Sequence, residues 1–118
     1  MLSPRQQFGD YGEQVAEKVL VKKGYKILER KFRSRMGEID LIAKDRETLV
    51  FVEVKSRLNN KFGRPEEAVT PWKLRHIQKT AEYYCLIKKI KSAKMRIEVV
   101  AIQYKEGKLE SIRIIPVL

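Results

Sequence analysis

Hydrophobic residues near the start of the chain recur at intervals of three and four positions, a spacing typical of an amphipathic helix. They are Phe8, Tyr11, Val15, Ala16, Val19 and Leu20. Ser3 and Pro4, with Gln6 three positions after the serine, resemble a capping box that begins a helix. Gly24 suits the position just beyond the end of such a helix. We therefore predict a helix that begins at Pro4 and is closed by Gly24.

Five runs of the chain have the composition of β-strands, with turn residues between them. They are residues 25–32, 37–43, 48–57, 95–104 and 109–117. The short turn KDRE makes the second and third runs an antiparallel hairpin, and KEGK connects the last two. Thr70 and Pro71 predict the start of a second amphipathic helix that runs to about Lys89. LNNKFGRPEE precedes that helix as a loop or a short helical entry, and IKSAK breaks the pattern after it.

The order of these elements is αβββαββ, without an internal repeat, a low-complexity segment or a linker. This order predicts one α/β domain over residues 1–118, in which helices pack on a mixed sheet. The chain has 118 residues, of which 43% are hydrophobic and 35% are charged. That length and composition are sufficient to bury a core without disulfides or structural metals.

The chain is strongly basic, since 26 Lys and Arg residues against 15 Asp and Glu residues give a net charge of +11. Such an excess on a small domain favours a polyanionic partner, usually nucleic acid. A solubilising surface and an anionic membrane surface are the alternatives. A membrane-surface protein needs a basic amphipathic helix with an exposed apolar face, whereas the second helix needs its apolar stripe to cover the sheet. We therefore expect no membrane partner.

Cys85 is the sole cysteine, which excludes an internal disulfide and a cysteine-based zinc site and suits a reducing compartment. The segment MLSPRQQFGDYGE lacks the apolar region of a secretory signal. No apolar run approaches membrane-spanning length. We expect a cytoplasmic protein.

Charged residues interrupt the apolar pattern of the second and third strands, GEIDLIAKD and LVFVEVKSR. Side chains alternate along a strand, which predicts the residues that share a face. These are Glu38, Asp40 and Ile42 on the second strand, and Phe51, Glu53 and Lys55 on the third. Valines 50, 52 and 54 take the opposite face of the third strand. Pairing of the two strands can then bring Asp40 beside Glu53 and Lys55.

Two carboxylates and one ammonium group suit the hydrolysis of a phosphodiester bond. Asp40 and Glu53 offer hard oxygen ligands to Mg²⁺, and the backbone carbonyl of Val54 could complete the ligand set. The metal would polarise the scissile phosphate and lower the pKa of a bound water. Lys55 would position that water and offset negative charge in the transition state. The alternative is an ion pair between strands, which stabilises a sheet by up to about 1 kcal/mol.

Asp40, Glu53 and Lys55 resemble the PD-(D/E)XK nuclease motif, with Ile39 where the proline of that motif would stand. More narrowly, nearly the whole chain resembles the YraN family of predicted endonucleases. The segments that carry this resemblance are GDYGEQVAEKVLVKKGYKIL, GEIDLIAKD, LVFVEVKSR and FGRPEEAV, followed by Lys73. The spacing of the helix, the aspartate and the Glu-x-Lys is also similar to that of the archaeal Holliday-junction resolvases. The resemblance implies a restriction-endonuclease-like fold and a metal-dependent nuclease site.

The resemblance also implies a role for Glu13, because the resolvases carry a glutamate near the metal at this place in the first helix. Gly9 and Gly12 weaken the helix beside it, by about 1 kcal/mol each relative to alanine, which suggests a close approach by another element. The alternative is that Asp10 and Glu13 merely favour an N-terminal helical turn.

Glu38 is typical of the family, and three roles are open to it: a support for the metal ligands, a partner for an arginine, or an added ligand. The chain departs from the family pattern at Lys31, where asparagine is frequent, and at Ile97-Glu98, where Phe-Asp is frequent. Glu98 keeps the negative charge, so we expect the central triad to be unaffected.

Basic residues bracket the acidic segment, an arrangement that suits DNA because they hold phosphates while the metal neutralises the acids. The candidate contacts are Arg33, Arg35, Arg57, Lys61, Lys73 and Arg75. Trp72 could stack on an unpaired base, although packing against a strand is the commoner use of such a residue. His76 is expected at the surface or near a phosphate.

These observations lead us to expect a Mg²⁺-dependent endonuclease that acts on DNA, with Mn²⁺ as a substitute metal and RNA as an open alternative. Asp40, Glu53, the Val54 carbonyl and Glu13 are the residues expected at the metal, and Lys55 is expected at the water. Branched DNA follows from the resemblance to the resolvases, and a two-fold homodimer would suit a four-way junction. The rival interpretation is a non-catalytic nucleic-acid-binding module that keeps the nuclease fold, although such a module would not need buried acids that repel phosphate.

Overall fold

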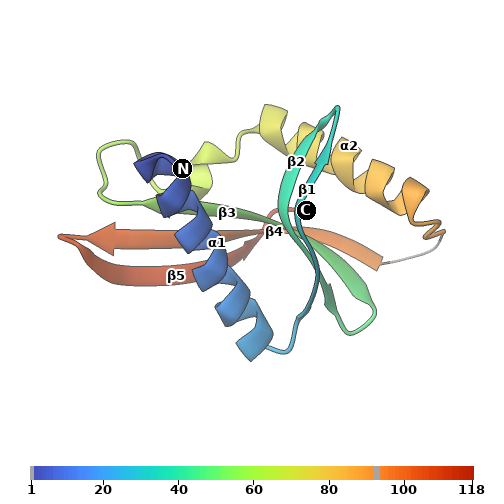
Figure 1. Ribbon diagram of the computed structural model, residues 1–118, viewed down its shortest axis with the longest axis horizontal. Coiled ribbons are helices and arrows are strands. Elements are labelled where there is room, and N and C mark those ends of the chain that lie inside the picture. Colours follow the sequence, from blue (N-terminus) through green and yellow to red (C-terminus); the bar gives the residue numbers. More distant parts are fainter. Residues whose placement is uncertain (1, 92–93) are drawn as a thin grey trace.

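Two helices and five strands form in the predicted order in the computed structural model, which describes residues 2–91 and 94–118 (Figure 1). They are α1 (Pro4–Lys22), β1 (Lys26–Ser34), β2 (Gly37–Asp45), β3 (Thr48–Arg57), α2 (Pro71–Ile87), β4 (Lys94–Lys105) and β5 (Lys108–Pro116). A short 3₁₀ helix, η1 (Pro65–Ala68), precedes α2. The α/β class and the αβββαββ order are confirmed. The predicted break at residues 90–94 includes residues 92 and 93, which lie outside the described residues.

Both helices begin at the predicted capping residues. Ser3 Oγ accepts a hydrogen bond from the Gln6 backbone N–H at 3.1 Å, and the Gln6 side chain accepts one from the Ser3 backbone at 2.9 Å. Thr70 Oγ1 accepts a hydrogen bond from the Lys73 backbone at 3.2 Å. Gly24 has a φ of 99°, which glycine adopts without the strain that a side chain would add. Within the described residues, neither helix is both long and apolar enough to cross a membrane.

The five strands form one sheet in the order β1-β2-β3-β4-β5. Neighbouring strands are antiparallel except for β3 and β4, which are parallel because the segment with α2 carries the chain back between them. The predicted mixed sheet and both predicted hairpins are therefore confirmed. β3, which carries Glu53 and Lys55, is the central strand.

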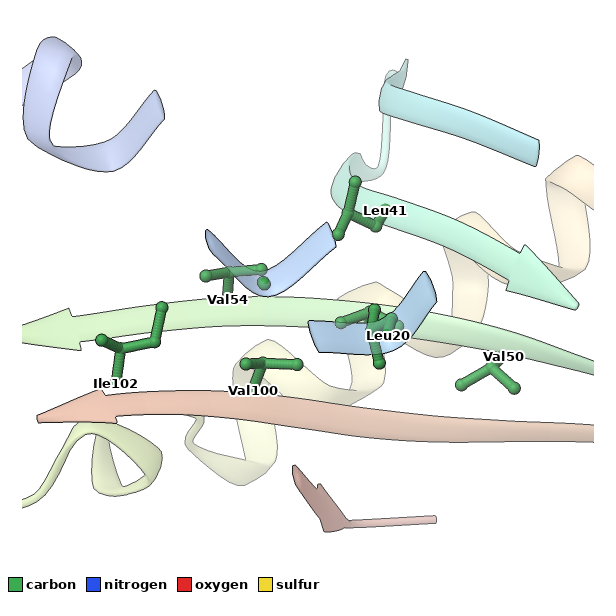
Figure 2. Close-up of a cluster of buried hydrophobic side chains, with 8 residues drawn as sticks. Leu20, Leu41, Val50, Val54, Val100 and Ile102 are labelled. Atoms are coloured by element: carbon green, nitrogen blue, oxygen red, sulfur yellow. The ribbon is translucent and has the colours of Figure 1, made fainter. Parts of the chain in front are cut away.

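Alternate residues of β3 face two separate hydrophobic cores. Val50 and Val54 pack with Leu20 of α1 in one cluster, and Figure 2 shows the Leu20 side chain among the valines of the neighbouring strands. Phe51 packs with Ile77 of α2 in the other cluster. The two helices therefore cover opposite faces of the sheet, and the alternation predicted for β3 is confirmed.

The helix α1 approaches β3 closely at Gly12. A Cβ atom on Gly12 would lie 2.6 Å from Ser56 Oγ, whereas a Cβ atom on Gly9 would meet no atom within 4 Å. The predicted close approach is confirmed at Gly12 and is wrong at Gly9, because Gly12 is buried against the sheet and Gly9 is exposed. This contact brings Glu13, the next residue of the helix, near the end of β3.

Candidate active site

The strands β2 and β3 separate at Asp40. The last residues of their ladder at this end are Leu41 and Val52. Beyond this pair, the Val54 backbone N–H donates a hydrogen bond to Asp40 Oδ2 at 2.8 Å, where a carbonyl of β2 would accept it if the ladder continued. The N–H and C=O of one residue in a strand point to the same edge, so the Val54 carbonyl lies on the edge beside Asp40. The divergence of the two strands therefore places the Asp40 carboxylate beside the Val54 backbone carbonyl.

Strict alternation fails along β2. The pattern predicted Glu38, Asp40 and Ile42 on one face and the residues between them on the other. Ile39 and Ile42, which are three positions apart, nevertheless pack in the same cluster with α2. This prediction is wrong: the change of face falls between Ile39 and Ile42, where the ladder with β3 stops at Leu41 while β2 stays paired with β1.

Glu53 is the buried acid of the site. Its side chain is 5% exposed, and Oε1 lies 3.9 Å from Lys73 Nζ. Among the described residues, Glu53 Oε2 has no hydrogen-bond partner. Burial, followed by the neighbouring Asp40 carboxyl group, raises the pKa of Glu53 from its ordinary value near 4.5 to about 9. A buried carboxylate with an unpaired oxygen is unfavourable unless a positive group binds it.

Lys55 is half-buried, two residues beyond Glu53 on β3. Burial, followed by the nearby Lys73 ammonium, lowers the pKa of Lys55, because both effects disfavour its charged form. Lys73 approaches from the first turn of α2. The site therefore combines two acids, Asp40 and Glu53, with two lysines.

Glu13 approaches from α1 and is held by a lysine. Lys31 Nζ lies 3.3 Å from the Glu13 carboxylate and 2.7 Å from Asp10 Oδ1. Burial and the charge of Asp40 raise the pKa of Glu13. Lys31 has a φ of 51°, a left-handed conformation in which asparagine is enriched. Lys31, which stands where the family frequently has asparagine, therefore keeps a backbone conformation that asparagine favours. Its side chain binds Glu13.

One cleft of about 750 Å³ contains most of the predicted site residues. Those that line it are Glu13, Glu38, Asp40, Glu53, Val54, Lys55, Arg57 and Lys73. The predicted nucleic-acid contacts that lie outside the lining are Arg33, Arg35, Lys61 and Arg75. Arg33 lies 3.5 Å from Glu38, so the pairing of Glu38 with an arginine is the role that the structure supports.

The cleft also contains residues that sequence reasoning did not assign to it. Arg5 lines it from α1. Arg5 lies four positions before Gly9 and eight before Glu13, so the three residues lie on one side of the helix, and this spacing could have identified Arg5. Phe62 lines it from the loop after β3, where no periodicity offers a signal. Trp72 lines it and is 62% exposed, so the commoner expectation, that this residue packs against a strand, is wrong.

The residues at the cleft fit a hard divalent cation. The unpaired Glu53 Oε2 and the Asp40 carboxylate supply anionic oxygens, and the Val54 carbonyl lies on the same edge. Over residues 2–91 and 94–118, no group of three or more His, Cys, Asp and Glu side chains is placed to hold a metal ion. Glu13 is paired with Lys31 instead. One or two carboxylates are nevertheless what Mg²⁺ usually takes from a protein, because it keeps several waters.

Glu98, at the other departure from the family pattern, belongs to a buried network outside the cleft. Arg96 lies 3.1 Å from Glu98 and 2.6 Å from Asp45. The Tyr25 hydroxyl donates a hydrogen bond to Glu98 at 2.8 Å. The network ties the start of β4 to the end of β2, and the charge of Glu98 is paired with Arg96 within it.

The fold and the cleft define an α/β protein with two acids and two lysines at the point where two strands of a mixed sheet separate. The chain belongs to the uncharacterised protein family UPF0102, the YraN family, whose sequence model matches residues 12–102. The predicted family is thus confirmed. A UPF0102 protein of Caldicellulosiruptor saccharolyticus is 46% identical over 98 residues, which are 83% of each chain. A UPF0102 protein of Desulfosudis oleivorans is 44% identical over 113 residues, which are 96% of this chain and 92% of the relative.

The metal-free protein is expected to lose stability as the pH rises from about 5 to about 9. The pKa of Glu53 is raised in the folded state, so between its unfolded and folded pKa values the folded state binds more protons than the unfolded chain. The free energy of unfolding therefore falls with rising pH, by about 5 kcal/mol between pH 5 and pH 9 for a shift of this size. Urea denaturation in chelator at several pH values measures it.

The matched variant for this measurement is Glu53→Gln, which cannot ionise at that position. Lys55 and the other titrating groups are present in both proteins, so the difference between the two pH curves isolates Glu53. We expect the variant to be the more stable protein at the alkaline end of the range. Parallel curves for the two proteins would contradict the raised pKa.

Proposed function

We propose that this protein is a metal-dependent nuclease that hydrolyses phosphodiester bonds in DNA, on a restriction-endonuclease-like fold. The observation that carries the proposal is the buried Glu53 with an unpaired Oε2 beside Asp40 and Lys55, in a cleft of a strongly basic chain. A carboxylate buried in this way lowers stability, and structural reasons alone do not account for it, because its nearest cation is 3.9 Å away. The membership of the YraN family supports the same proposal.

Asp40, Glu53 and the Val54 carbonyl are the groups that would hold Mg²⁺, or Mn²⁺ in its place. When bound, the ion neutralises charge on the phosphate and lowers the pKa of a coordinated water. The hydrogen bond from the Val54 N–H orients Asp40, and burial in β3 restricts Glu53 to one position. Both acids are thereby preorganised, so little reorganisation is needed when substrate binds.

The basic residues of the cleft would bind the phosphates. Lys55 Nζ holds the attacking water and offsets negative charge that develops on the phosphate. Lys73, Arg57 and Arg5 line the same cleft and would contact neighbouring phosphates of the strand. Glu13, which lines the same cleft and is paired with Lys31, would support the metal at the edge of the site. A homodimer on a two-fold axis would place two such clefts on one branched DNA.

Incubation of the purified protein with labelled four-way junction, flap and single-stranded DNA tests the proposal. Each substrate is mixed with Mg²⁺, with Mn²⁺ and with chelator, and RNA of the same sequence is included. We expect cleavage of at least one DNA substrate that requires the metal and stops in chelator. Binding without cleavage of every substrate would favour the non-catalytic binding module and overturn the nuclease assignment.

A further inference from the structure

Two large aromatic rings are exposed at the cleft that holds the acids. Phe62, on the loop between β3 and η1, is 82% exposed, and Trp72, in the first turn of α2, is 62% exposed. Both line the cleft together with Asp40 and Glu53. Exposed apolar side chains gathered at a cleft mark a surface that binds another molecule.

Trp72 is held in place within this cleft. Its ring lies 3.9 Å from the His76 ring, centroid to centroid, at an angle of 35° between the planes. His76 Nδ1 is 2.9 Å from the Trp72 carbonyl, which restrains the imidazole. The indole is therefore ordered by a stack beneath it while most of its surface stays open to solvent. An ordered, open ring loses little conformational freedom when a second ring stacks on it.

Four cations line the cleft beside its four acids. Arg5, Arg57 and Lys73 line the same cleft, so the surface suits a phosphate backbone. A groove that combines positive charge with aromatic side chains is the arrangement that binds single-stranded nucleic acid, because the cations follow the phosphates and the rings stack on bases. In a continuous duplex each base is covered by its neighbours, and no base face is free to meet such a ring.

We propose that Phe62 and Trp72 stack on unpaired bases next to the phosphate bound at Asp40 and Glu53. The substrate class is then DNA with unpaired nucleotides at the site of cleavage, such as a single strand, a flap or an open branch point, rather than uninterrupted duplex. The statement about cleavage rests on the proposed nuclease function. The statement about binding does not.

Trp72 is the only tryptophan of the chain, so fluorescence excited at a wavelength that the five tyrosines do not absorb reports on this one ring. The protein, kept in chelator to prevent cleavage, is titrated with a single-stranded oligonucleotide and with the blunt duplex of the same sequence. We expect the single strand to quench the fluorescence and the duplex to leave it nearly unchanged at equal occupancy, measured by anisotropy of labelled DNA. Quenching by both forms alike, or by neither, would overturn the inference.

Substitutions separate stacking from a general apolar contact. Phe62→Leu keeps an apolar side chain but removes the ring, and Phe62→Tyr keeps the ring. We expect Phe62→Leu and Trp72→Leu each to weaken binding of the single strand by about tenfold or more, and Phe62→Tyr to retain it, with duplex binding unchanged throughout. Thermal melting verifies that each variant is folded. Equal losses in Phe62→Leu and Phe62→Tyr would contradict stacking.

Tyr11→Ala and Leu86→Ala are the control variants, since both side chains are exposed but neither lines the cleft. They should leave binding unchanged. If Phe62→Leu left single-strand binding intact and instead turned a dimer into a monomer in gel filtration, a second copy of the chain would cover the rings and the inference would be wrong.

The two proposals fail in distinguishable ways. Loss of single-strand binding in the ring variants, in a protein that cuts no substrate, would support the binding inference and overturn the nuclease function. Metal-dependent cleavage with the same preference between single strand and duplex in the wild type and in Phe62→Leu would support the nuclease function and overturn the inference.

Discussion

Replacement of Asp40 by asparagine is expected to slow phosphodiester cleavage by about a hundredfold or more, without loss of the fold. The amide oxygen can still accept the hydrogen bond from the Val54 N–H, which is 2.8 Å from Asp40 Oδ2 in the wild type. The negative charge that helps to bind the metal is lost, and preorganised electrostatic groups are commonly worth two to three orders of magnitude, about 10²–10³, in rate. Rates of metal-dependent cleavage under single-turnover conditions measure the effect.

Glu38→Gln is the matched control for Asp40→Asn. Glu38 lies on the same strand and lines the same cleft, but its carboxylate is paired with Arg33 at 3.5 Å. We expect this variant to keep a rate within about threefold of the wild type, because its charge is screened by solvent and by the arginine. Lys55→Ala should resemble Asp40→Asn. Cleavage that persists at the wild-type rate in Asp40→Asn or in Lys55→Ala would refute the site.

Replacement of Leu20 by alanine is expected to lower the free energy of unfolding by roughly 2–5 kcal/mol. Leu20 is fully buried and joins α1 to the core formed by valines of β3 and β4, as Figure 2 shows. Truncation removes apolar contacts and leaves a cavity that the surrounding strands cannot fill, because the sheet holds them in register. Chemical denaturation at neutral pH measures the change.

The adjacent residue offers a control on the same helix. Val21 is 53% exposed, so Val21→Ala should change the free energy of unfolding by about 0.5 kcal/mol or less. Leucine and valine differ in helix propensity by only about 0.5 kcal/mol, so helix propensity does not explain a difference of several kcal/mol between the two variants. Equal losses in the two variants would show that the core beneath α1 is not as described.

Most of the secondary structure was predictable because its signals are local. The capping residues Ser3 and Thr70 make hydrogen bonds to groups three residues away, and such contacts are visible in the order of residues alone. The alternation of β3 was also readable, since both faces of that strand are buried by helices. The same reasoning failed for Ile39, which lies beyond the last pair of β2 with β3, where only β1 still pairs with the strand.

The sequence predicted which acids form the candidate site, but only part of the set of residues that surround them. Glu53 stands out because a charge within an apolar strand requires a partner or a ligand. The lysine that actually approaches its carboxylate, Lys73, comes from another element, as does Trp72. The contact between Lys31 and Glu13 depends on a left-handed residue in β1, which the sequence pattern does not indicate.

The sequence by itself determined the element order, the helix starts, the hairpins, the excess of positive charge and the presence of acids within apolar strands. Those features follow from spacing, capping and composition, which act over a few residues. Only the tertiary structure decided that Asp40 binds the Val54 N–H, that Glu53 Oε2 is left without a partner among the described residues, and that exposed rings line the same cleft. These depend on where β2 leaves β3 and how α1 and α2 pack, because contacts between distant segments are set by packing and not by local order.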